Sequence, residues 1–257
     1  MSADGGLAGS VAVVTGALGK LGPVWSSALA GAGATVIGID RAAGAGAGLA
    51  RLEQTDVTDR AALERVRERV LDDFGTPTVL VNNAGIDQPP EATASSYRIE
   101  DVPLDGFRET LDVNLVGTFS ATQVFGAPMC AAGRGSIVNI GSLYATIAPE
   151  PSFYDHLGLD PPFLKPAAYG ASKAGVLSLT RYFARLWGPV GVRVNALSPG
   201  GFRGEQDEEF LRKYCERVPL RRMAEADDLV GPLLFLASDA SRYLTGHELR
   251  VDGGFTA

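Results

Sequence analysis

The stretch Val11-Ala-Val-Val-Thr-Gly-Ala-Leu-Gly-Lys-Leu-Gly22 decides the fold of this chain. Its first five residues form a short apolar run, which is typical of a buried strand. Glycines follow at positions 16, 19 and 22, and a helical pattern of small and apolar residues continues to Gly33. A strand, a glycine loop and a helix in this order open a dinucleotide-binding unit. The glycines let the backbone turn tightly and approach a pyrophosphate, and the free N–H groups at the helix start attract its charge.

A second apolar run, at 34–39, ends in Asp40. Dinucleotide-binding units place an acidic residue here, about 20 residues after the glycine loop. A carboxylate at this place accepts hydrogen bonds from the hydroxyls of an adenosine ribose and repels a 2′-phosphate, so the sequence favours NAD over NADP. Arg41 follows directly and weakens that preference. A solvated strand end without a function is the structural alternative for Asp40.

Strand and helix patterns alternate along the rest of the chain. We expect further strands near 53–58, 78–81, 136–141, 192–197 and 247–251, and further helices near 59–74, 105–132 and 205–218 and from Tyr169 to Trp187. This alternation predicts a single α/β domain over 1–257 with a doubly wound Rossmann fold, in which helices cover both faces of a mostly parallel seven-stranded sheet. The glycine-rich run at 42–48 is expected to be a loop within that domain.

The composition is that of an ordinary globular domain, with 46% hydrophobic and 21% charged residues in a chain of 257. The net charge is −7 and no basic run concentrates Lys or Arg, so we expect no nucleic-acid partner. No apolar run approaches the roughly 20 residues of a membrane helix, and the N-terminus lacks a signal pattern. We therefore expect a cytoplasmic protein without membrane contact. Cys130 and Cys215 lack metal-binding spacing, so we expect neither a metal site nor a disulfide.

Tyr169 and Lys173 are a candidate proton-transfer pair. They stand four residues apart in a helical pattern, so their side chains share one helix face. A neighbouring ammonium favours the phenolate and lowers the pKa of a tyrosine from about 10 toward working pH. The pair can then act as a general acid or base. Taken alone, two such residues are more often ordinary helix-surface residues, so the other motifs decide between the two interpretations.

Small and polar residues follow several predicted strands, at the sheet edge where parallel α/β proteins bind ligands. The run 82–85, Asn-Asn-Ala-Gly, lets a cofactor lie against the backbone, and its Asn side chains can tie strand ends together. Ser142 ends a strand, and Asp56 is expected to face an adenine ring. Asn114 lies in an apolar helical stretch, where an amide without partners costs about 1–3 kcal/mol. It is either satisfied by backbone groups or bends the helix and holds a water.

With these residues assembled, the chain resembles the short-chain dehydrogenase/reductase family from about Gly9 to Gly254. The shared motifs are Thr15-Gly16 with the glycine loop, Asn82-Asn83-Ala84-Gly85, Asn114, Ser142, Tyr169-x-x-x-Lys173, Ser198-Pro199-Gly200, and Tyr243-Leu-Thr-Gly246 with Val251-Asp252-Gly253-Gly254. The resemblance implies hydride transfer between a substrate carbon and nicotinamide C4. It implies that Ser142 steadies the substrate oxygen and that Tyr169 transfers its proton. Lys173 is implied to lower the Tyr169 pKa and bind the nicotinamide ribose, and Asn114 to hold a water in the proton relay.

The resemblance also implies a set of cofactor contacts. They are Gly16, Leu18, Gly19, Lys20, Leu21, Gly22, Asp40, Arg41, Asp56, Val57, Asn83, Ala84, Gly85, Tyr169, Lys173, Pro199, Gly200 and Phe202. Lys20 stands at the middle glycine of the family's loop and either approaches the phosphates or lies in solvent. The run 199–204 lacks the threonine with which many relatives hold the carboxamide, so backbone contacts would replace it.

The segment of about 145–165 is an insertion, because Ser142 and Tyr169 stand further apart than is usual in the family. Tyr154 would suit the usual spacing, but Gly158 stands where its lysine would be. We expect the aromatic and proline-rich insertion to form a wall over the substrate, with a surface loop or a subunit contact as the alternative. The substrate candidates are Ser142, Tyr144, Phe153, Tyr154, His156 and Arg203. A lid is expected at about 202–220, although core packing explains its apolar stripe equally well.

A looser similarity, in the glycine loop, the long Ser-to-Tyr segment and Ser-Pro-Gly-Gly, is to a family branch linked to bacterial surface-sugar biosynthesis. It implies a hydroxylated, sugar-like substrate. The leading hypothesis is an NAD(H)-dependent oxidoreductase that interconverts a secondary alcohol and a ketone, and the resemblance implies a homotetramer or homodimer. An NADPH-dependent ketoreductase of an apolar or polyketide-like carbonyl is one alternative, suggested by Lys20, Arg41 and the aromatic insertion. A non-catalytic, cofactor-sensing binding protein is another, but it would not need Ser142, Tyr169 and Lys173 together.

Overall fold

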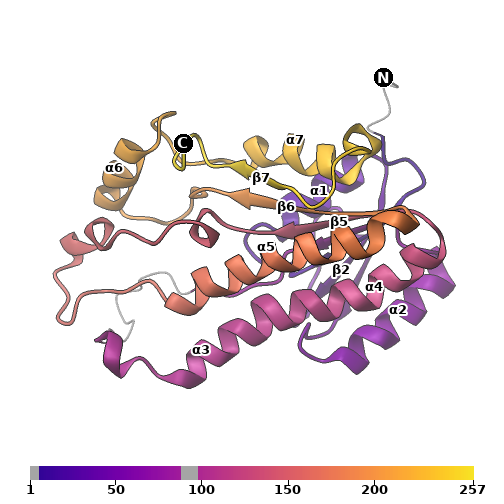
Figure 1. Cartoon of the computed structure of the whole chain (residues 1–257), viewed down its shortest axis with the longest axis horizontal. Coiled ribbons are helices and arrows are strands. Elements are labelled where there is room, and N and C mark those ends of the chain that lie inside the picture. The colour runs from indigo at the N-terminus through magenta and orange to yellow at the C-terminus, as the bar shows by residue number, and fades with distance from the viewer. Residues whose placement is uncertain (1–5, 88–97) are drawn as a thin grey trace.

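In the computed structural model, which describes residues 6–87 and 98–257, seven strands form one parallel sheet. Figure 1 shows this sheet between its helices. The strands are β1 (Val11–Thr15), β2 (Thr35–Asp40), β3 (Arg51–Gln54), β4 (Val79–Asn82), β5 (Gly135–Ile140), β6 (Val192–Pro199) and β7 (Glu248–Val251). Their order is β3-β2-β1-β4-β5-β6-β7, and every neighbouring pair is parallel. The doubly wound fold expected from the sequence is confirmed, and the described sheet is wholly rather than mostly parallel.

Helices cover both faces of the sheet (Figure 1). The α-helices are α1 (Gly22–Gly31), α2 (Arg60–Phe74), α3 (Leu104–Leu111), α4 (Thr118–Ala131), α5 (Ala167–Trp187), α6 (Glu208–Arg217) and α7 (Ala226–Ala237). A π-helical turn, η2 (Asp112–Gly117), joins α3 to α4. The 3₁₀ turns are η1 (Ile99–Asp101), η3 (Leu143–Ala145), η4 (Pro151–Phe153), η5 (Asp155–Leu157), η6 (Gly188–Val190) and η7 (Asp239–Ser241).

Successive side chains of each strand point to opposite faces of the sheet, so each face carries its own hydrophobic layer. On one face, Val14 of β1 packs in a cluster with Trp25 of α1 and with apolar residues of α7. On the other face, Val13 packs in a cluster with Phe125 of α4 and with residues of α2 and α5. All four side chains are fully buried. Burying a side chain of this size stabilises the fold by about 1.5–3 kcal/mol, so the two layers hold the sheet rigidly between its helices.

The expected helices agree with the structure except at three places. The helix expected at 105–132 is divided into α3, the turn η2 and α4, and the one expected at 205–218 is the shorter α6. The sequence patterns did not predict α7, which carries Pro232 in its interior. Because proline usually ends a helix, Pro232 argued against a helix at this place in the sequence. A capping box between Glu225 and Asp228 starts α7 by satisfying free N–H groups.

The strand order places a ligand crevice between β1 and β4. Strand β1 pairs with β2 on one side and with β4 on the other, so the chain direction of the crossovers reverses there. Because all strands are parallel, their carboxyl ends meet at one edge. In open α/β sheets, ligands bind outside the carboxyl ends of the strands at such a reversal.

Buried amides connect the centre of the sheet to two helices. The Asn82 Nδ2 donates to Asn139 Oδ1 and to Thr122 Oγ1, at 2.8 Å each. The Asn139 Nδ2 donates to Thr180 Oγ1 at 2.9 Å. These bonds cross-link β4 and β5 to α4 and α5, so the prediction that Asn82 ties neighbouring strand ends together is confirmed.

Two features of the described ranges concern metal binding and membranes. Within residues 6–87 and 98–257, no cluster of three His, Cys, Asp or Glu side chains is arranged to hold a metal ion. Cys130 and Cys215 are free and half-buried. None of the helices in these ranges is both long and apolar enough to cross a bilayer.

Candidate active site

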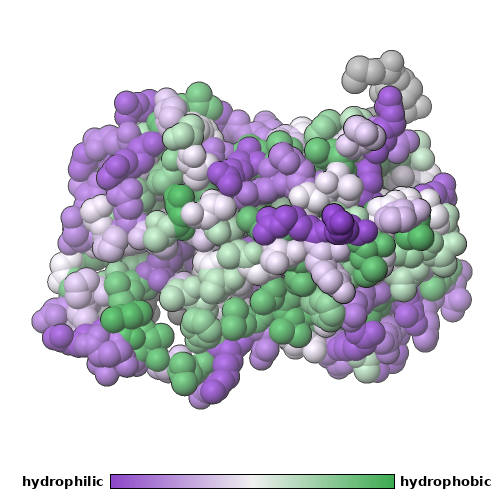
Figure 2. All heavy atoms as spheres, in the orientation of Figure 1, coloured by the Kyte–Doolittle hydropathy of each residue, from purple (hydrophilic) through white to green (hydrophobic). Residues whose placement is uncertain are grey.

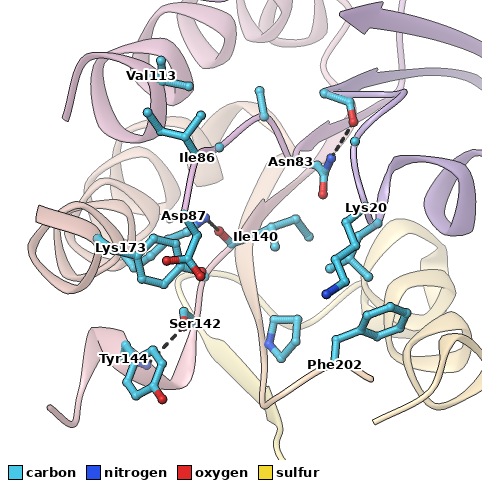
Figure 3. Close-up of a pocket in the computed structure, with 18 of the residues that line it drawn as sticks. Lys20, Asn83, Ile86, Asp87, Val113, Ile140, Ser142, Tyr144, Lys173 and Phe202 are labelled. Atoms are coloured by element: carbon cyan, nitrogen blue, oxygen red, sulfur yellow. Dashed lines mark hydrogen bonds between the residues drawn. The ribbon is translucent and has the colours of Figure 1, made fainter. Parts of the chain in front are cut away.

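A cavity of about 850 Å³ lies over the crevice between β1 and β4 (Figure 3). Its walls come from the segments that follow β1 to β6 and from α5 and α6. Lys20 and Phe202 lie on one side of the view, and Ser142, Tyr144 and Lys173 lie on the other. One continuous cavity therefore joins the glycine loop to the candidate proton-transfer residues. All the cofactor residues expected from the sequence line it except Gly22.

The glycine loop is shaped by close backbone contacts. Gly16 has a φ of +64°, and a Cβ there would lie 2.7 Å from the Ala84 Cα. A Cβ at Gly22 would collide with the carbonyl oxygens of Gly16 and Ala17, so Gly22 serves packing behind the loop. Gly19 is exposed, and a Cβ there would meet only the Gly16 carbonyl oxygen, at 3.2 Å. The loop leads into α1, whose N-cap Leu21 offers no side-chain acceptor. This combination fits a dinucleotide pyrophosphate.

Asn83 ties the glycine loop to β4 and α1. Its Nδ2 donates to the carbonyl oxygens of Thr15 and Gly16 at 3.1 and 2.9 Å. Its Oδ1 accepts from the Trp25 Nε1 at 2.8 Å. The prediction that Asn83 connects neighbouring strand ends is thereby confirmed, and the side chain is fully engaged in holding the loop (Figure 3).

The Asp40 carboxylate is held in place at the end of β2 by two backbone groups. Oδ2 accepts from the Leu18 N–H and Oδ1 from the Ala42 N–H, both at 2.9 Å. A carboxylate has about four lone-pair sites, so each oxygen can still accept a hydrogen bond from a ribose hydroxyl. Arg41 is exposed and also lines the cavity. The adenosine end therefore carries both signs of charge.

Tyr169 and Ser142 meet at the opposite end of the cavity. Tyr169 lies in the first turn of α5, and Ser142 follows β5, where its Oγ accepts from the Tyr144 N–H at 3.2 Å. Burial raises the pKa of Tyr169 above its ordinary value, the charge of Asp87 raises it further, and a hydrogen bond with Ser142 lowers it. The net effect is a rise, so the phenol keeps its proton near neutral pH.

Lys173 is buried beside this pair. Its Nζ donates to the Ile140 carbonyl oxygen at 2.7 Å and lies 5.8 Å from the centre of the Tyr169 ring (Figure 3). Burial lowers the pKa of Lys173 to about 8, and the charge of Asp87 opposes this decrease. The lowering of the Tyr169 pKa that was expected from Lys173 is not found. Burial is the largest cause of the pKa shift of both groups, because it disfavours the phenolate and the ammonium alike.

Asn114 is fully buried within the π-helical turn η2 and does not line the cavity. Its Oδ1 accepts from the Ile86 N–H at 2.8 Å. Its Nδ2 donates to the Ile86 carbonyl oxygen and to the Ser172 Oγ, at 3.1 Å each. Protein groups therefore supply hydrogen-bond partners for the Asn114 amide, which is one of the two alternatives expected from the sequence. Its role in a proton relay stays a prediction. These contacts position the backbone next to Gly85, where a Cβ would lie 3.3 Å from the Asn114 Oδ1.

Three of the six expected substrate residues line the cavity, namely Ser142, Tyr144 and Tyr154. The other three do not line it, so their contact with substrate stays a prediction. Phe153 packs against other aromatic rings below the surface, and Arg203 is exposed. His156 points to Asp207, with 2.8 Å between Nε2 and Oδ1. Residue types identify such candidates, but the turns within the insertion decide which of them face the cavity.

The insertion packs against α6 through a cluster of aromatic side chains, which we call the aromatic cap. The cap comprises Phe153, Tyr154 and Phe163 of the insertion, Phe210 and Tyr214 of α6, and apolar neighbours. The centre of the Tyr154 ring lies 4.8 Å from that of Phe163 and 5.4 Å from that of Phe210. Tyr154, Phe210 and Tyr214 also line the cavity, so the cap forms one of its walls.

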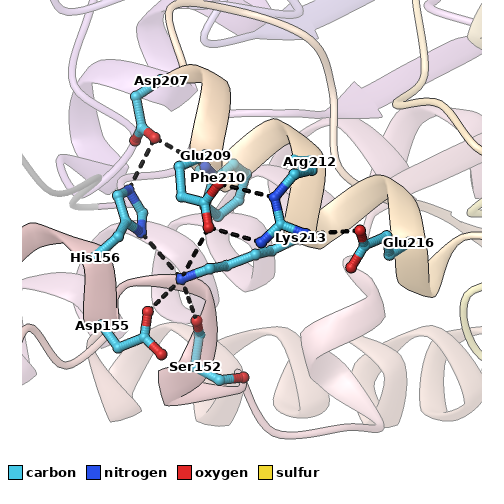
Figure 4. Close-up of polar contacts among 9 residues, drawn as sticks. All are labelled: Ser152, Asp155, His156, Asp207, Glu209, Phe210, Arg212, Lys213 and Glu216. Carbon is cyan, nitrogen blue, oxygen red and sulfur yellow. Dashed lines mark hydrogen bonds and ion pairs between the residues drawn. The ribbon is translucent and has the colours of Figure 1, made fainter.

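Polar contacts around Lys213 join the same two segments (Figure 4). The Lys213 Nζ donates to the Ser152 carbonyl oxygen at 3.1 Å, pairs with the Asp155 carboxylate and lies 3.4 Å from the His156 Nδ1. The carboxylate of Asp207, the N-cap of α6, lies 2.8 Å from the other ring nitrogen of His156. α6 is therefore fastened to the insertion at both its start and its middle.

Two charged residues of the cavity had no signal in the sequence motifs. Asp87 and Lys165 both line the cavity, and the Lys165 Nζ lies 2.7 Å from the Asp87 Oδ2. The Lys165 side chain is only 8% exposed. Its ammonium lies 5.6 Å from the ring centre of Tyr144 and 5.4 Å from that of Tyr169. The two partners are 78 positions apart, so no local pattern could reveal the pair.

The chain matches known proteins over almost its whole length. Residues 21–256 match the family model described as enoyl-(acyl carrier protein) reductase. The chain is 36% identical to galactitol 2-dehydrogenase (L-tagatose-forming) from Cereibacter sphaeroides, with 97% of this chain and 96% of the relative covered. It is 35% identical to D-threitol dehydrogenase from Mycolicibacterium smegmatis, with 97% and 94% covered.

Solved structures show the same architecture. A short-chain dehydrogenase from Leptospira borgpetersenii with bound NAD⁺ superposes with a TM-score of 0.88 at 30% identity, and 100% of this chain and 96% of that one are covered. A gluconate 5-dehydrogenase from Burkholderia cenocepacia in complex with NADP and tartrate gives a TM-score of 0.83 at 29% identity, with 98% and 97% covered. Since these matches extend over the sheet, the cavity and its motifs, the chain belongs to the short-chain dehydrogenase/reductase family of oxidoreductases, which use NAD or NADP.

Proposed function

We propose that this enzyme uses NAD(H) to interconvert a secondary alcohol and a ketone on a hydroxylated, sugar-like substrate. One observation carries the proposal: a single cavity joins Asp40 and the glycine loop to Ser142, Tyr169 and Lys173. The galactitol and D-threitol dehydrogenases that the chain resembles bear the names of sugar alcohols, which supports a hydroxylated substrate.

In this proposal Tyr169 moves the proton and Ser142 orients the substrate oxygen. The nicotinamide ring, when bound, supplies the carbon that gives or takes the hydride. The raised pKa of Tyr169 keeps the phenol protonated near neutral pH, which suits an acid that protonates the oxygen of a ketone. In the opposite direction the phenol must first lose its proton, so alcohol oxidation is favoured by alkaline pH. Ser142 donates its hydroxyl hydrogen to the same substrate oxygen.

Lys173 and Asn114 are assigned supporting roles. Below its pKa of about 8, Lys173 is an ammonium held by Ile140, and in this form it stabilises negative charge that develops on the Tyr169 oxygen. We also assign it a hydrogen bond to the nicotinamide ribose. Asn114 fixes the backbone at Ile86, which lines the cavity. The proton relay through an Asn114-held water remains part of the proposal.

NAD is proposed as the cofactor because Asp40 lies at the end of β2 with capacity to accept ribose hydroxyls. A specific observation favours one alternative: Arg41 and Lys20 also line the cavity and would attract a 2′-phosphate or other phosphate oxygens. The alternative is the NADPH-dependent ketoreductase of an apolar carbonyl, for which the aromatic cap would form the pocket wall.

We also propose that α6 with its flanking loops acts as a lid over the cavity.

We further propose that the enzyme is a homo-oligomer, a tetramer or a dimer. Figure 2 shows hydrophobic residues gathered over α4 and α5 on one face of the molecule. On neighbouring elements, Val116 of η2 is 48% exposed, and Tyr182 and Leu186 of α5 are 61% and 53% exposed. Large exposed apolar areas of this kind commonly mark subunit contacts. Sedimentation of the wild type and of a Tyr182→Lys, Leu186→Lys variant tests this, and a monomeric wild type would refute it.

The deciding experiment is an assay of the purified protein with NAD and with NADP against polyols, free sugars and simple secondary alcohols, following the absorbance of reduced nicotinamide. Turnover of hydroxylated substrates with NAD supports the proposal. Turnover confined to NADPH and apolar ketones supports the alternative. Cofactor binding without turnover of any substrate would refute both and indicate a binding protein.

A further inference from the structure

We infer that Asp87 and Lys165 together recognise two hydroxyl groups of the substrate, and that the substrate class is therefore the neutral polyols and their ketoses, not the sugar acids. This inference rests on the proposed function, because it concerns the groups that flank the reacting carbon in the same cavity.

The first step is the position of the pair beside the proton-transfer residues. Lys165 Nζ lies over the face of Tyr169, 5.4 Å from the ring centre, and Asp87 is close enough for its charge to act on both Tyr169 and Lys173. In Figure 3 the Asp87 carboxylate lies on the same side of the cavity as Ser142 and Lys173. A substrate whose oxygen lies between Ser142 and Tyr169 therefore brings its neighbouring carbons against the pair.

The second step is the hydrogen-bonding capacity that remains. An ammonium has three N–H donors, and within the described chain one of them serves Asp87 Oδ2. Asp87 has a second carboxylate oxygen, and its side chain is 36% exposed. The pair therefore offers a donor and an acceptor about 3 Å apart, the spacing of one hydrogen bond. Adjacent hydroxyl groups, one accepting from Lys165 and one donating to Asp87, match this arrangement.

The third step is charge. Among the described residues, four Lys and Arg side chains line the cavity, of which Lys20 and Arg41 lie at the dinucleotide end and Lys173 is engaged with Ile140. Within this part of the chain Lys165 is thus the cation that faces the substrate, and Asp87 neutralises it at 2.7 Å. A substrate carboxylate that accepted from a remaining N–H donor of Lys165 would lie beside the Asp87 carboxylate, in a cavity that Asp207 also lines. Like charges at such distances are repelled strongly in a partly desolvated site, so neutral hydroxyls fit better.

The test compares three probes in NAD-linked oxidation: a polyol (galactitol or threitol), gluconate as a sugar acid, and cyclohexanol, which has no second hydroxyl. We expect the wild type to favour the polyol over gluconate in kcat/KM. In Asp87→Asn, the ratio of kcat/KM for the polyol to that for cyclohexanol should fall about 10- to 100-fold, because one charge-assisted hydrogen bond to a polyol hydroxyl is lost. In the same variant, the ratio of kcat/KM for gluconate to that for the polyol should rise about tenfold, because Lys165 is no longer neutralised. Lys165→Met should lower the polyol-to-cyclohexanol ratio by a similar factor without the gain for gluconate.

Ratios between substrates cancel the effect of Asp87 on the pKa of Tyr169, since all three probes use the same proton transfer. Matched controls are Asp73→Asn and Arg51→Met, which break a surface ion pair of 2.6 Å outside the cavity and should leave every ratio unchanged. Cofactor affinity, measured by fluorescence, verifies that each variant is folded. Preference of the wild type for gluconate, or ratios in both variants within about twofold of the wild type, would overturn the inference while leaving the proposed function intact. Absence of turnover with any alcohol would overturn the proposed function and this inference together.

Discussion

The Lys173 ammonium donates to the Ile140 carbonyl oxygen at 2.7 Å from a side chain that is only 5% exposed. Burial lowers its pKa to about 8, from 10.5. Between these values the unfolded chain holds more protons than the folded one, so stability rises with pH across this window and falls as pH drops through 8. We expect the free energy of unfolding of the wild type, relative to Lys173→Met, to rise by about 2 kcal/mol from pH 7 to 9.5. Urea titrations of both proteins measure it, and a flat difference would contradict the burial of a charged Lys173.

The proton-transfer assignment predicts a specific loss in Tyr169→Phe. Removing the hydroxyl should lower kcat at least about 1,000-fold, because general acid catalysis commonly contributes 10²–10⁴-fold. The affinity for the dinucleotide should change less than about threefold, since the ring remains in place. Steady-state kinetics and fluorescence titration measure the two quantities. Tyr154→Phe is the matched control, because Tyr154 also lines the cavity but lacks a lysine partner. Equal losses in the two variants would refute the assignment.

Asp40 is expected to set the cofactor preference. In Asp40→Ser, the carboxylate no longer repels a 2′-phosphate and Arg41 remains to bind it, so the ratio of kcat/KM for NAD to that for NADP should fall at least about tenfold. Asp40→Asn, which keeps an acceptor for the Leu18 N–H, separates the charge effect from the loss of loop support. A preference for NADP in the wild type would show that Arg41 dominates at this position.

Two glycines of the loop should respond differently to alanine. Gly16→Ala places a Cβ 2.7 Å from the Ala84 Cα in a backbone with a φ of +64°, so we expect a loss of about 2 kcal/mol or more in stability. Gly19→Ala meets only one oxygen at 3.2 Å. It should fold with nearly normal stability yet weaken dinucleotide binding about tenfold, because Gly19 lines the cavity at the glycine loop that we propose binds the pyrophosphate. Thermal unfolding and cofactor titration separate the two effects, and equal destabilisation would contradict this view of the loop.

The contacts of Lys213 should affect substrate binding more than stability. Lys213→Met removes the link from α6 to Ser152 and Asp155, so we expect the KM for substrate to rise about three- to tenfold as the cavity wall loosens. Partly exposed ion pairs contribute only about 0–1 kcal/mol, so the melting temperature should change little. Arg212→Met is the matched control, because Arg212 pairs only with Glu209 and Glu216 of the same helix in the described chain. The proposed lid would be refuted if both variants raised KM equally.

The sheet could be predicted from the sequence because its signals are local. The valine run at 11–15, the glycine loop and the residues at strand ends each fall within a few positions, and a parallel sheet brings them to one edge whatever the helices do. Ser142, Tyr169 and Lys173 were found for the same reason. The helix α7 was missed because Pro232 contradicts a helical pattern that tertiary packing nevertheless maintains.

The electrostatics of the site and its substrate end could not be predicted in this way. A lysine four residues after a tyrosine indicates a lowered tyrosine pKa, but the pKa of Tyr169 is raised because burial and the charge of Asp87 outweigh its hydrogen bond with Ser142. Burial depends on the whole chain. The pair of Asp87 and Lys165 joins a strand end to the far end of an insertion, and the inward turn of Tyr154 depends on the packing of the aromatic cap. Such contacts follow from the tertiary structure rather than from any motif.

The aromatic cap shares no buried residue with the hydrophobic clusters on the two faces of the sheet. Side chains within the cap can therefore be exchanged without opening a void behind the glycine loop or under Tyr169. This separation makes the cap the part of the enzyme that can be rebuilt for new alcohols while the residues proposed for hydride and proton transfer stay in place.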